Sequence, residues 1–473
     1  MKCKGFAFMS HPPVAIPEVG KGQENDIPQT LIGFRRTAEK IKEWEPDVLI
    51  IVTPHGNSFR DAISVIDNNR IVGSLSNFGY YKKVVKSIYS NINSKLKERW
   101  TKKGIPNVFL SKVEAKQYRL RLELDHGALV PLYFIDEVYK DYEIMHITPG
   151  FLSSLQLYKA GMIMAEVMEE QNKSYAIIAS ADLSHALKDS GPYKYHPDGE
   201  KFDELMLKYF QENKPENIFS IPNKMKENAK QCGYNSYVFA LGFFDKKEIS
   251  INVSSYQGTF GVGYMNGYGE IVKDKTTSRL ETIKELSNKK YQEETNNEDA
   301  YVKLARKAIG EIVKINNRLS WEEFKQSITE KKAEELERKS GGAFVTIHSN
   351  GHLRGCIGTT MSTKKNLAEE IIANAISAAT RDPRFYPINE DELSELDIKV
   401  DVLGDLEKIN TKNDLDVNKY GVVVECGKRR GLLLPDLEGV NSVEEQIKIA
   451  KEKANIKKEE ECVLYRFEVI RHQ

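Results

Sequence analysis

Residues 48–56, VLIIVTPHG, join a run of five apolar residues to a Thr-Pro-His-Gly turn. An apolar run of this length, bounded by Pro and Gly, is typical of a strand buried in a parallel sheet. Buried parallel strands deliver their C-terminal residues to one edge of the sheet, where α/β proteins build their sites. The segment therefore predicts an α/β fold and makes His55 a candidate site residue.

Three more of the nine histidines have similar contexts: His11 in FAFMSHPP, His126 in LELDHGALVPL and His185 in AIIASADLSH. A single histidine after a strand is often structural, but four in matching places favour a shared site. Flanking Pro and Gly stiffen a turn and let the backbone pass close to an ion. Histidine is also the commonest transition-metal ligand and a proton carrier near neutral pH. The pattern predicts a metal centre with acid-base histidines.

Residues 1–272 alternate strand-like and helical stretches, which predicts an α/β domain with a central, mostly parallel sheet and helices on its faces. The expected strands are 5–9, 48–53, 107–110, 142–147, 175–179 and 249–255, and the expected helices are 29–44, 79–97, 153–172, 201–211 and 234–244.

A polar segment, 273–298, is expected to be a partly helical linker. Residues 299–473 then open with an amphipathic stretch, YVKLARKAIGEIVKI, and contain Asn350-Gly351, the dipeptide preferred in two-residue hairpin turns. Helices combined with hairpins predict a smaller α+β domain.

Composition excludes several classes of protein. Lys+Arg and Asp+Glu both total 69, so a general nucleic-acid or acidic-membrane binder is not expected. No apolar run approaches the ~20 residues of a membrane span, and the N-terminus lacks the features of a signal peptide. Five scattered cysteines do not form a disulfide framework, which favours a reducing cytoplasm.

The ordered set His11, TPHG, DHG and ADLSH resembles the LigB-like superfamily of class III extradiol dioxygenases and their Memo-like relatives, over about residues 1–272. The resemblance implies a non-haem Fe(II) held by His11, His55 and a third ligand. His126 and His185 match the family's histidines that bind substrate and move protons. The resemblance also implies a small aromatic or related oxygenated substrate.

The third ligand of this chain differs from that of the ring-cleaving members, which is a Glu. Here the matching stretch reads ENAKQCGYNSYVFALGFF and offers Cys232, as in Memo-like proteins. A helix N-terminus favours a thiolate, which binds iron, zinc or copper well. A buried structural Cys is the alternative reading, and Glu227 is the fallback carboxylate. Oxygenase activity is in doubt, since oxygenases usually have two His and a carboxylate.

Two interpretations of Asp182 remain open: it orients a histidine by accepting a ring N–H, or it caps the following helix. Asp125, next to His126, has the same two readings.

In the second half, LRGCIG (353–358), RDPRF (381–385) and GLLLPD resemble the AMME chromosomal-region candidate-gene family, over about 299–473. With a Memo-like first half, this resembles part of the AmmeMemoRadiSam system, which implies a radical-SAM enzyme as partner. Cys356 is a candidate nucleophile or tether, with Arg354 favouring its thiolate and Arg381 and Arg384 holding an anion. The alternative is a small buried Cys in a tight hairpin.

Three hypotheses remain for the function of the chain. It is a metal-dependent enzyme with an extradiol-dioxygenase-like site, a metal-binding protein without oxygenase chemistry, or a partner or scaffold of a radical-SAM enzyme. A homo-oligomer is compatible with each of them.

Overall fold

In the computed structural model, residues 2–338, 341–437 and 439–473 are described. The chain divides into two compact units, which are treated separately below. The first comprises Met1–Glu294 and Asn350–His352, and the second comprises Thr295–Ser349 and Leu353–Gln473.

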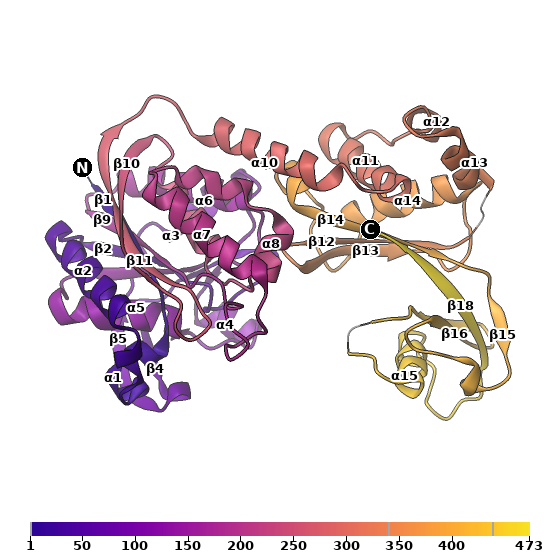
Figure 1. Cartoon of the computed structure of the whole chain (residues 1–473), viewed down its shortest axis with the longest axis horizontal. Coiled ribbons are helices and arrows are strands. Elements are labelled where there is room, and N and C mark those ends of the chain that lie inside the picture. Colours follow the sequence, from indigo (N-terminus) through magenta and orange to yellow (C-terminus); the bar gives the residue numbers. More distant parts are fainter. Residues whose placement is uncertain (1, 339–340, 438) are drawn as a thin grey trace. The chain divides into compact units, whose positions relative to one another are not determined.

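An eight-stranded sheet forms the centre of the first unit (Figure 1). Its order is β10 (Lys247–Gln257), β11 (Tyr264–Asp274), β1 (Cys3–Met9), β9 (Tyr175–Ser180), β2 (Val48–Val52), β8 (Glu143–Thr148), β3 (Ile63–Ile66) and β6 (Asn107–Leu110). The neighbours β1, β9, β2 and β8 run parallel, so their C-terminal ends meet at one edge. The predicted α/β fold class is confirmed.

Helices cover both faces of this sheet, which explains why β2 is apolar throughout. Val48, Ile50 and Val52 pack into one core, whereas Leu49 and Ile51 point into the other, because successive strand residues face opposite sides. The first core includes residues of α3 (Asn93–Lys102), α6 (Ser154–Glu169), α7 (Pro197–Gln211) and α9 (Tyr234–Gly242), and the second those of α2 (Pro28–Trp44) and α5 (His126–Val138).

The helix predicted over 79–97 is wrong. Its first part is a strand, β5 (Tyr80–Ser87), paired antiparallel with β4 (Arg70–Leu75), which also pairs with β7 (Glu123–Leu124). The run YYKKVVKS is rich in aromatic and β-branched residues, which suit a pleated, half-exposed surface better than a helix. Helix α3 begins only at Asn93.

The segment 273–298, expected as a linker, holds the end of β11 and helix α10 (Leu280–Thr295). Ile283 is fully buried in the core of the first unit, so most of this segment belongs to that unit.

The second unit is built on an antiparallel sheet, as expected for an α+β domain. Its order is β13 (His352–Gly358), β12 (Ala343–Ser349), β14 (Leu396–Leu403), β18 (Val463–His472), β16 (Tyr420–Cys426) and β17 (Arg429–Leu433), and β15 (Glu407–Ile409) pairs with β18. Asn350 and Gly351, between β12 and β13, have φ of +50° and +75°, as a two-residue hairpin turn requires.

Hydrophobic cores support the sheet of the second unit. One includes residues of α11 (Ala300–Ile315), α12 (Trp321–Lys325), α13 (Glu330–Arg338) and α14 (Leu367–Thr380), and another includes those of α15 (Val443–Lys453). A smaller cluster is formed by Leu403, Val423 and Phe467.

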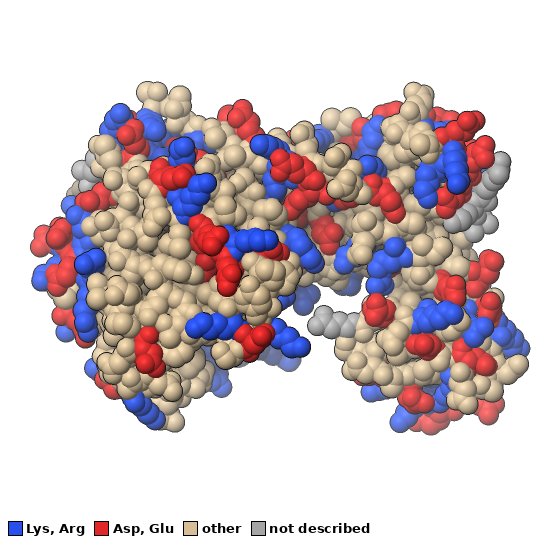
Figure 2. Space-filling model, viewed as in Figure 1, with Lys and Arg blue, Asp and Glu red and all other residues tan. Residues whose placement is uncertain are grey.

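Charges of both signs are mixed over the face of the molecule seen in Figure 2, in keeping with equal numbers of acidic and basic residues. Within the described ranges, no helix has the length and apolar character needed to cross a bilayer.

Candidate metal centre

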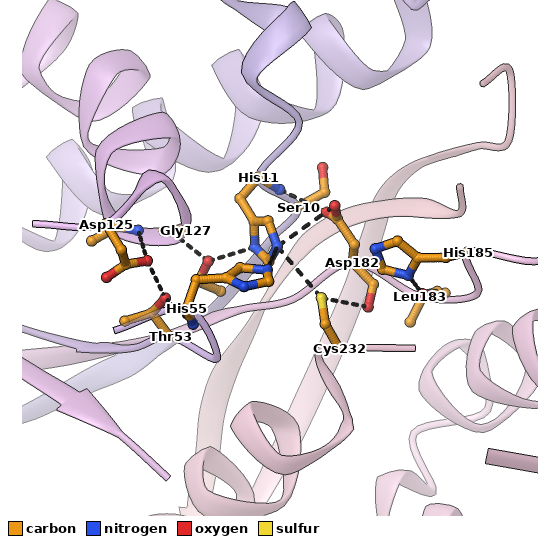
Figure 3. A network of polar contacts seen from close by, with 12 residues as sticks. Ser10, His11, Thr53, His55, Asp125, Gly127, Asp182, Leu183, His185 and Cys232 are labelled. Atoms are coloured by element: carbon orange, nitrogen blue, oxygen red, sulfur yellow. Dashed lines mark hydrogen bonds and ion pairs between the residues drawn. The ribbon is translucent and has the colours of Figure 1, made fainter. Parts of the chain in front are cut away.

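The C-terminal edge of the parallel strands gathers the predicted ligands (Figure 3). His11 follows β1, His55 follows β2, and Cys232 lies two residues before α9. One ligand atom from each lies within 4.8 Å of the others, as a metal site requires. The three residues lie far apart in the sequence, and the fold brings them together at this edge of the sheet.

Distances within this cluster are short. The Nε2 atom of His11 lies 3.1 Å from Nε2 of His55 and 3.5 Å from Sγ of Cys232. His11 is only 2% exposed, Cys232 is half-buried and His55 is exposed. The site is therefore anchored in the interior by His11 and opens to solvent at His55.

Hydrogen bonds fix the tautomer of His11. The Ser180 hydroxyl donates to the backbone oxygen of Gly127 at 2.5 Å, so its oxygen is left to accept from His11 Nδ1 at 2.9 Å. With the proton on Nδ1, Nε2 presents a lone pair to His55 and Cys232. A histidine that binds a metal is commonly held in this way, with its other ring N–H donated to the protein.

Burial keeps the histidines of the site in their neutral, ligand-competent form. It lowers the pKa of His11 well below its ordinary value, and a second positive charge on His55 would disfavour protonation further. His55 is partly open to solvent, but desolvation of its ring, which packs against His126, lowers the pKa of His55 to about 4. The pKa of His126 is lowered by burial, and that of His185 falls to about 4 for the same reason. A neutral imidazole is the form that binds a metal or accepts a proton.

Cys232 differs from the expectation that a helix N-terminus favours its thiolate. Burial raises the pKa of Cys232 well above its ordinary value, and the charge of Asp182 adds to the effect. The thiol is therefore protonated in the metal-free protein, and binding of a metal would release the proton.

Asp182 does not cap a helix, since α7 begins only at Pro197. One carboxylate oxygen accepts the backbone N–H of His11 at 2.8 Å, and the other lies 3.6 Å from His11 Nε2. Asp182 thus accepts a hydrogen bond from the backbone of the predicted ligand His11 rather than from a histidine ring N–H. The carboxylate beside the cluster is that of Asp182. Glu227, the fallback carboxylate ligand, is not among the three residues brought together.

A second group of residues, not foreseen as a unit, lies beside the cluster. Asp125 caps α5 by accepting from the Ala128 N–H, and it also accepts from Thr53 Oγ1 at 2.6 Å and pairs with His146 Nε2 at 2.7 Å. Thr53 in turn accepts the backbone N–H of His55. Both interpretations of Asp125 are realised, and His146, on β8, is its ring partner. The sequence signal that could have found His146 is its position on a strand that ends at the edge where the site lies.

The predicted proton carriers also lie at this edge. The ring of His126 stacks on that of His55, with centroids 4.3 Å apart. His185 Nδ1 contacts the Leu183 carbonyl at 3.1 Å, so Nδ1 carries the proton and Nε2 is the basic atom. Figure 3 shows His185 on the same side of the cluster as Asp182 and Cys232.

Asp203, which the sequence did not single out, supports the loop that carries His185. It is 1% exposed and accepts from the Ser184 N–H at 2.8 Å and from Tyr256 OH at 2.7 Å. Burial raises its pKa to about 7 despite these bonds.

We expect this raised pKa to make the stability of the metal-free protein depend on pH. A raised carboxyl pKa stabilises the folded state fully below 3.8 and progressively less as pH rises to about 7. Asp203→Asn should flatten that decline in the free energy of unfolding, measured by urea titration at several pH values. An equally steep decline in the variant would contradict the assignment, and Asp198→Asn serves as a half-buried control from the same helix.

Cys356, the other predicted catalytic residue, lies on β13 of the second unit. Its Sγ is 3.3 Å from Thr346 Oγ1, and its backbone N–H donates to Asp382. Arg354 does not act on the thiol as expected, because it is paired with Glu392. Arg384 pairs with Asp382 and donates to the carbonyl of Cys356 at 3.3 Å. The catalytic role of Cys356 stays a prediction.

Comparison with known proteins agrees with this division of the chain. The profile of the catalytic LigB subunit of aromatic ring-opening dioxygenase matches residues 5–267, and that of AMMECR1 matches residues 302–472. Protein CA_C1420 of Clostridium acetobutylicum is 41% identical over 474 residues, which is 100% of both chains. A protein of Thermotoga maritima is 54% identical over 142 residues, covering 30% of this chain and 82% of its own.

Solved structures also match, among them two uncharacterized proteins. Uncharacterized protein PH0010 from Pyrococcus horikoshii is 30% identical, covers 36% of this chain and 88% of its own, and has a TM-score of 0.32. Uncharacterized protein JW3007 from Escherichia coli is 14% identical, covers 56% of this chain and 99% of its own, and has a TM-score of 0.38.

The α/β fold and the match to the LigB profile define a protein with an extradiol-dioxygenase-like fold. The chain belongs to the family of the catalytic LigB subunit of aromatic ring-opening dioxygenases, and it carries an AMMECR1 domain after the LigB domain.

Proposed function

We propose that this chain is a metal-dependent enzyme in which His11, His55 and Cys232 hold one metal ion, Fe(II), and in which a small aromatic or related oxygenated substrate reacts. The observation that carries the proposal is the tautomer of His11, whose Nε2 lone pair faces the other two ligand atoms. Imidazole and thiolate ligands also suit zinc and copper, and family membership favours iron.

When bound, the metal would supply a Lewis-acidic, redox-active centre for the substrate oxygen. The chain's own residues would then handle protons and orientation. His185, neutral and basic at Nε2, would accept a proton from a substrate hydroxyl. His126 would hydrogen-bond a substrate oxygen, and Asp182 would hold the backbone of His11 in place.

A second candidate is a metal-binding protein without oxygenase activity. The thiol at Cys232 favours it, because the third ligand of the ring-cleaving oxygenases is a carboxylate. Asp182 lies 3.6 Å from His11 Nε2 but is already engaged with the His11 backbone.

Metal content of protein purified without oxygen tests the proposal. We expect about one iron ion per chain in the wild type and far less in Cys232→Ala, because a thiolate ligand and its charge are lost. Cys3→Ala, which removes a fully buried thiol of the same unit, is the control and should keep its iron. Zinc in place of iron would redirect the function to hydrolytic or lyase chemistry, and a metal-free wild type would contradict the site.

A further inference from the structure

Two cysteines of the second unit lie opposite each other on neighbouring strands. Cys426 ends β16 and Cys462 directly precedes β18. These strands pair antiparallel with Glu425 opposite Val463, so the same register places Cys426 opposite Cys462. Burial, together with the neighbouring Cys426 thiol, raises the pKa of Cys462, in keeping with this proximity.

This placement is compatible with a disulfide. Opposed residues of an antiparallel pair have Cα atoms about 4.5–5.5 Å apart, and disulfides span about 4.4–6.8 Å. Both thiols are half-buried rather than sealed in the core, so a small oxidant can reach them. The bond would close a loop that contains β17 and α15.

Charged groups surround the pair. Arg429 Nη2 donates to Cys426 Sγ at 3.7 Å, and the same guanidinium is paired with Glu460. The Glu460 carbonyl accepts from Cys462 Sγ at 3.3 Å and from Lys451 Nζ at 2.7 Å. Arg429 therefore places a hydrogen-bond donor beside the Cys426 sulfur, the atom that would attack an oxidant as a thiolate.

The same charges argue against a metal site. The carboxylate nearest to Cys426, that of Glu460, is paired with Arg429 and is therefore not free to bind a metal ion. A thiol pair beside an arginine is better suited to oxidation than to metal binding.

We propose that Cys426 and Cys462 form a redox-active dithiol that a peroxide oxidises to a disulfide. The Cys426 thiolate attacks one peroxide oxygen, an S–O bond forms, the O–O bond breaks, and the leaving hydroxide takes a proton to give water. Cys462 sulfur then attacks the Cys426 sulfenic acid, the S–S bond forms and the S–O bond breaks. The Cys462 proton leaves with that oxygen as a second water, so the peroxide gains the two electrons that the thiols lose.

Hydrogen peroxide titration of the reduced full-length chain tests the proposal. Free thiols should fall from five to three, and peptide mapping should recover one linked pair containing Cys426 and Cys462, which dithiothreitol separates. Arg429→Ala should slow the loss of the two thiols by about tenfold, because the hydrogen-bond donor beside the attacking Cys426 sulfur is removed.

Cys426→Ser and Cys462→Ser should each abolish the linked peptide, whereas Cys356→Ser, the matched control on another strand of the unit, should retain it. Oxidation of both cysteines to sulfinic acid without a linked peptide would overturn the proposal. So would linkage of either to a different cysteine, or protection of both thiols by stoichiometric zinc.

Discussion

Replacing His11 with Ala should lower the affinity for metal by at least about 100-fold, because the loss of even an outer-shell partner of a ligand costs about 10–100-fold. His11 is the most buried member of the cluster, and its Nε2 is the atom that both His55 and Cys232 contact. The fold should survive, since Asp182 bonds the backbone N–H of residue 11, which the variant keeps. Anaerobic titration of the metal-free protein with Fe(II) or Zn(II) measures the effect.

His185→Ala is the matched control for this experiment. His185 lies at the same edge, but its ring bonds the Leu183 carbonyl and it is not among the clustered ligands. It should therefore bind metal almost as the wild type does. If His11→Ala kept its full metal affinity while its circular dichroism spectrum matched that of the wild type, the ligand assignment would be wrong.

Much of the candidate site could be predicted from the sequence, because the fold class fixes where strand ends meet. His11 and His55 follow strands that were recognisable as apolar runs, and parallel pairing of β1, β9 and β2 brings those ends to one edge. The family resemblance supplied what the strands could not, namely that Cys232, from a helical region, joins the histidines.

The parts that were not foreseen depend on tertiary contacts. The sequence pattern around His146 is that of an ordinary buried strand, and only the tertiary structure, which brings the N-cap residue of α5 next to β8, reveals its bond to Asp125. Similarly, a helix N-terminus favours a thiolate, but the depth of Cys232 in the protein, which no local pattern encodes, reverses the direction of its pKa shift.

The strand β5 shows a different limit. The helix predicted over 79–97 was wrong for Tyr80–Ser87, which pairs with β4 as a strand. The aromatic and β-branched residues of this run suit a strand, and pairing with β4 realises that preference.

Replacing Gly233 with Ala should destabilise the first unit by about 3 kcal/mol, the upper end for overpacking a well-packed site. A Cβ on Gly233 would lie 2.3 Å from Ala181 Cβ, 2.6 Å from Ala181 Cα and 2.8 Å from the Asp182 oxygen. Two of these neighbours are backbone atoms that cannot rotate away. Since Gly233 N–H also donates to the Asp182 carbonyl, relief of the clash must move either Cys232 or the residues after β9. We therefore expect metal affinity to fall together with the free energy of unfolding.

Gly258→Ala is the matched control, because its added Cβ would meet the flexible end of Leu187 at 2.9 Å and no backbone atom within 4 Å. It should cost less than about 1 kcal/mol and leave metal binding unchanged. Urea unfolding of the metal-free proteins and metal titration of the folded ones separate the two effects. A Gly233→Ala protein as stable as the Gly258→Ala control would mean that the residues after β9 move aside at little cost in free energy. The close packing that holds Cys232 beside His11 would then not be what shapes the site.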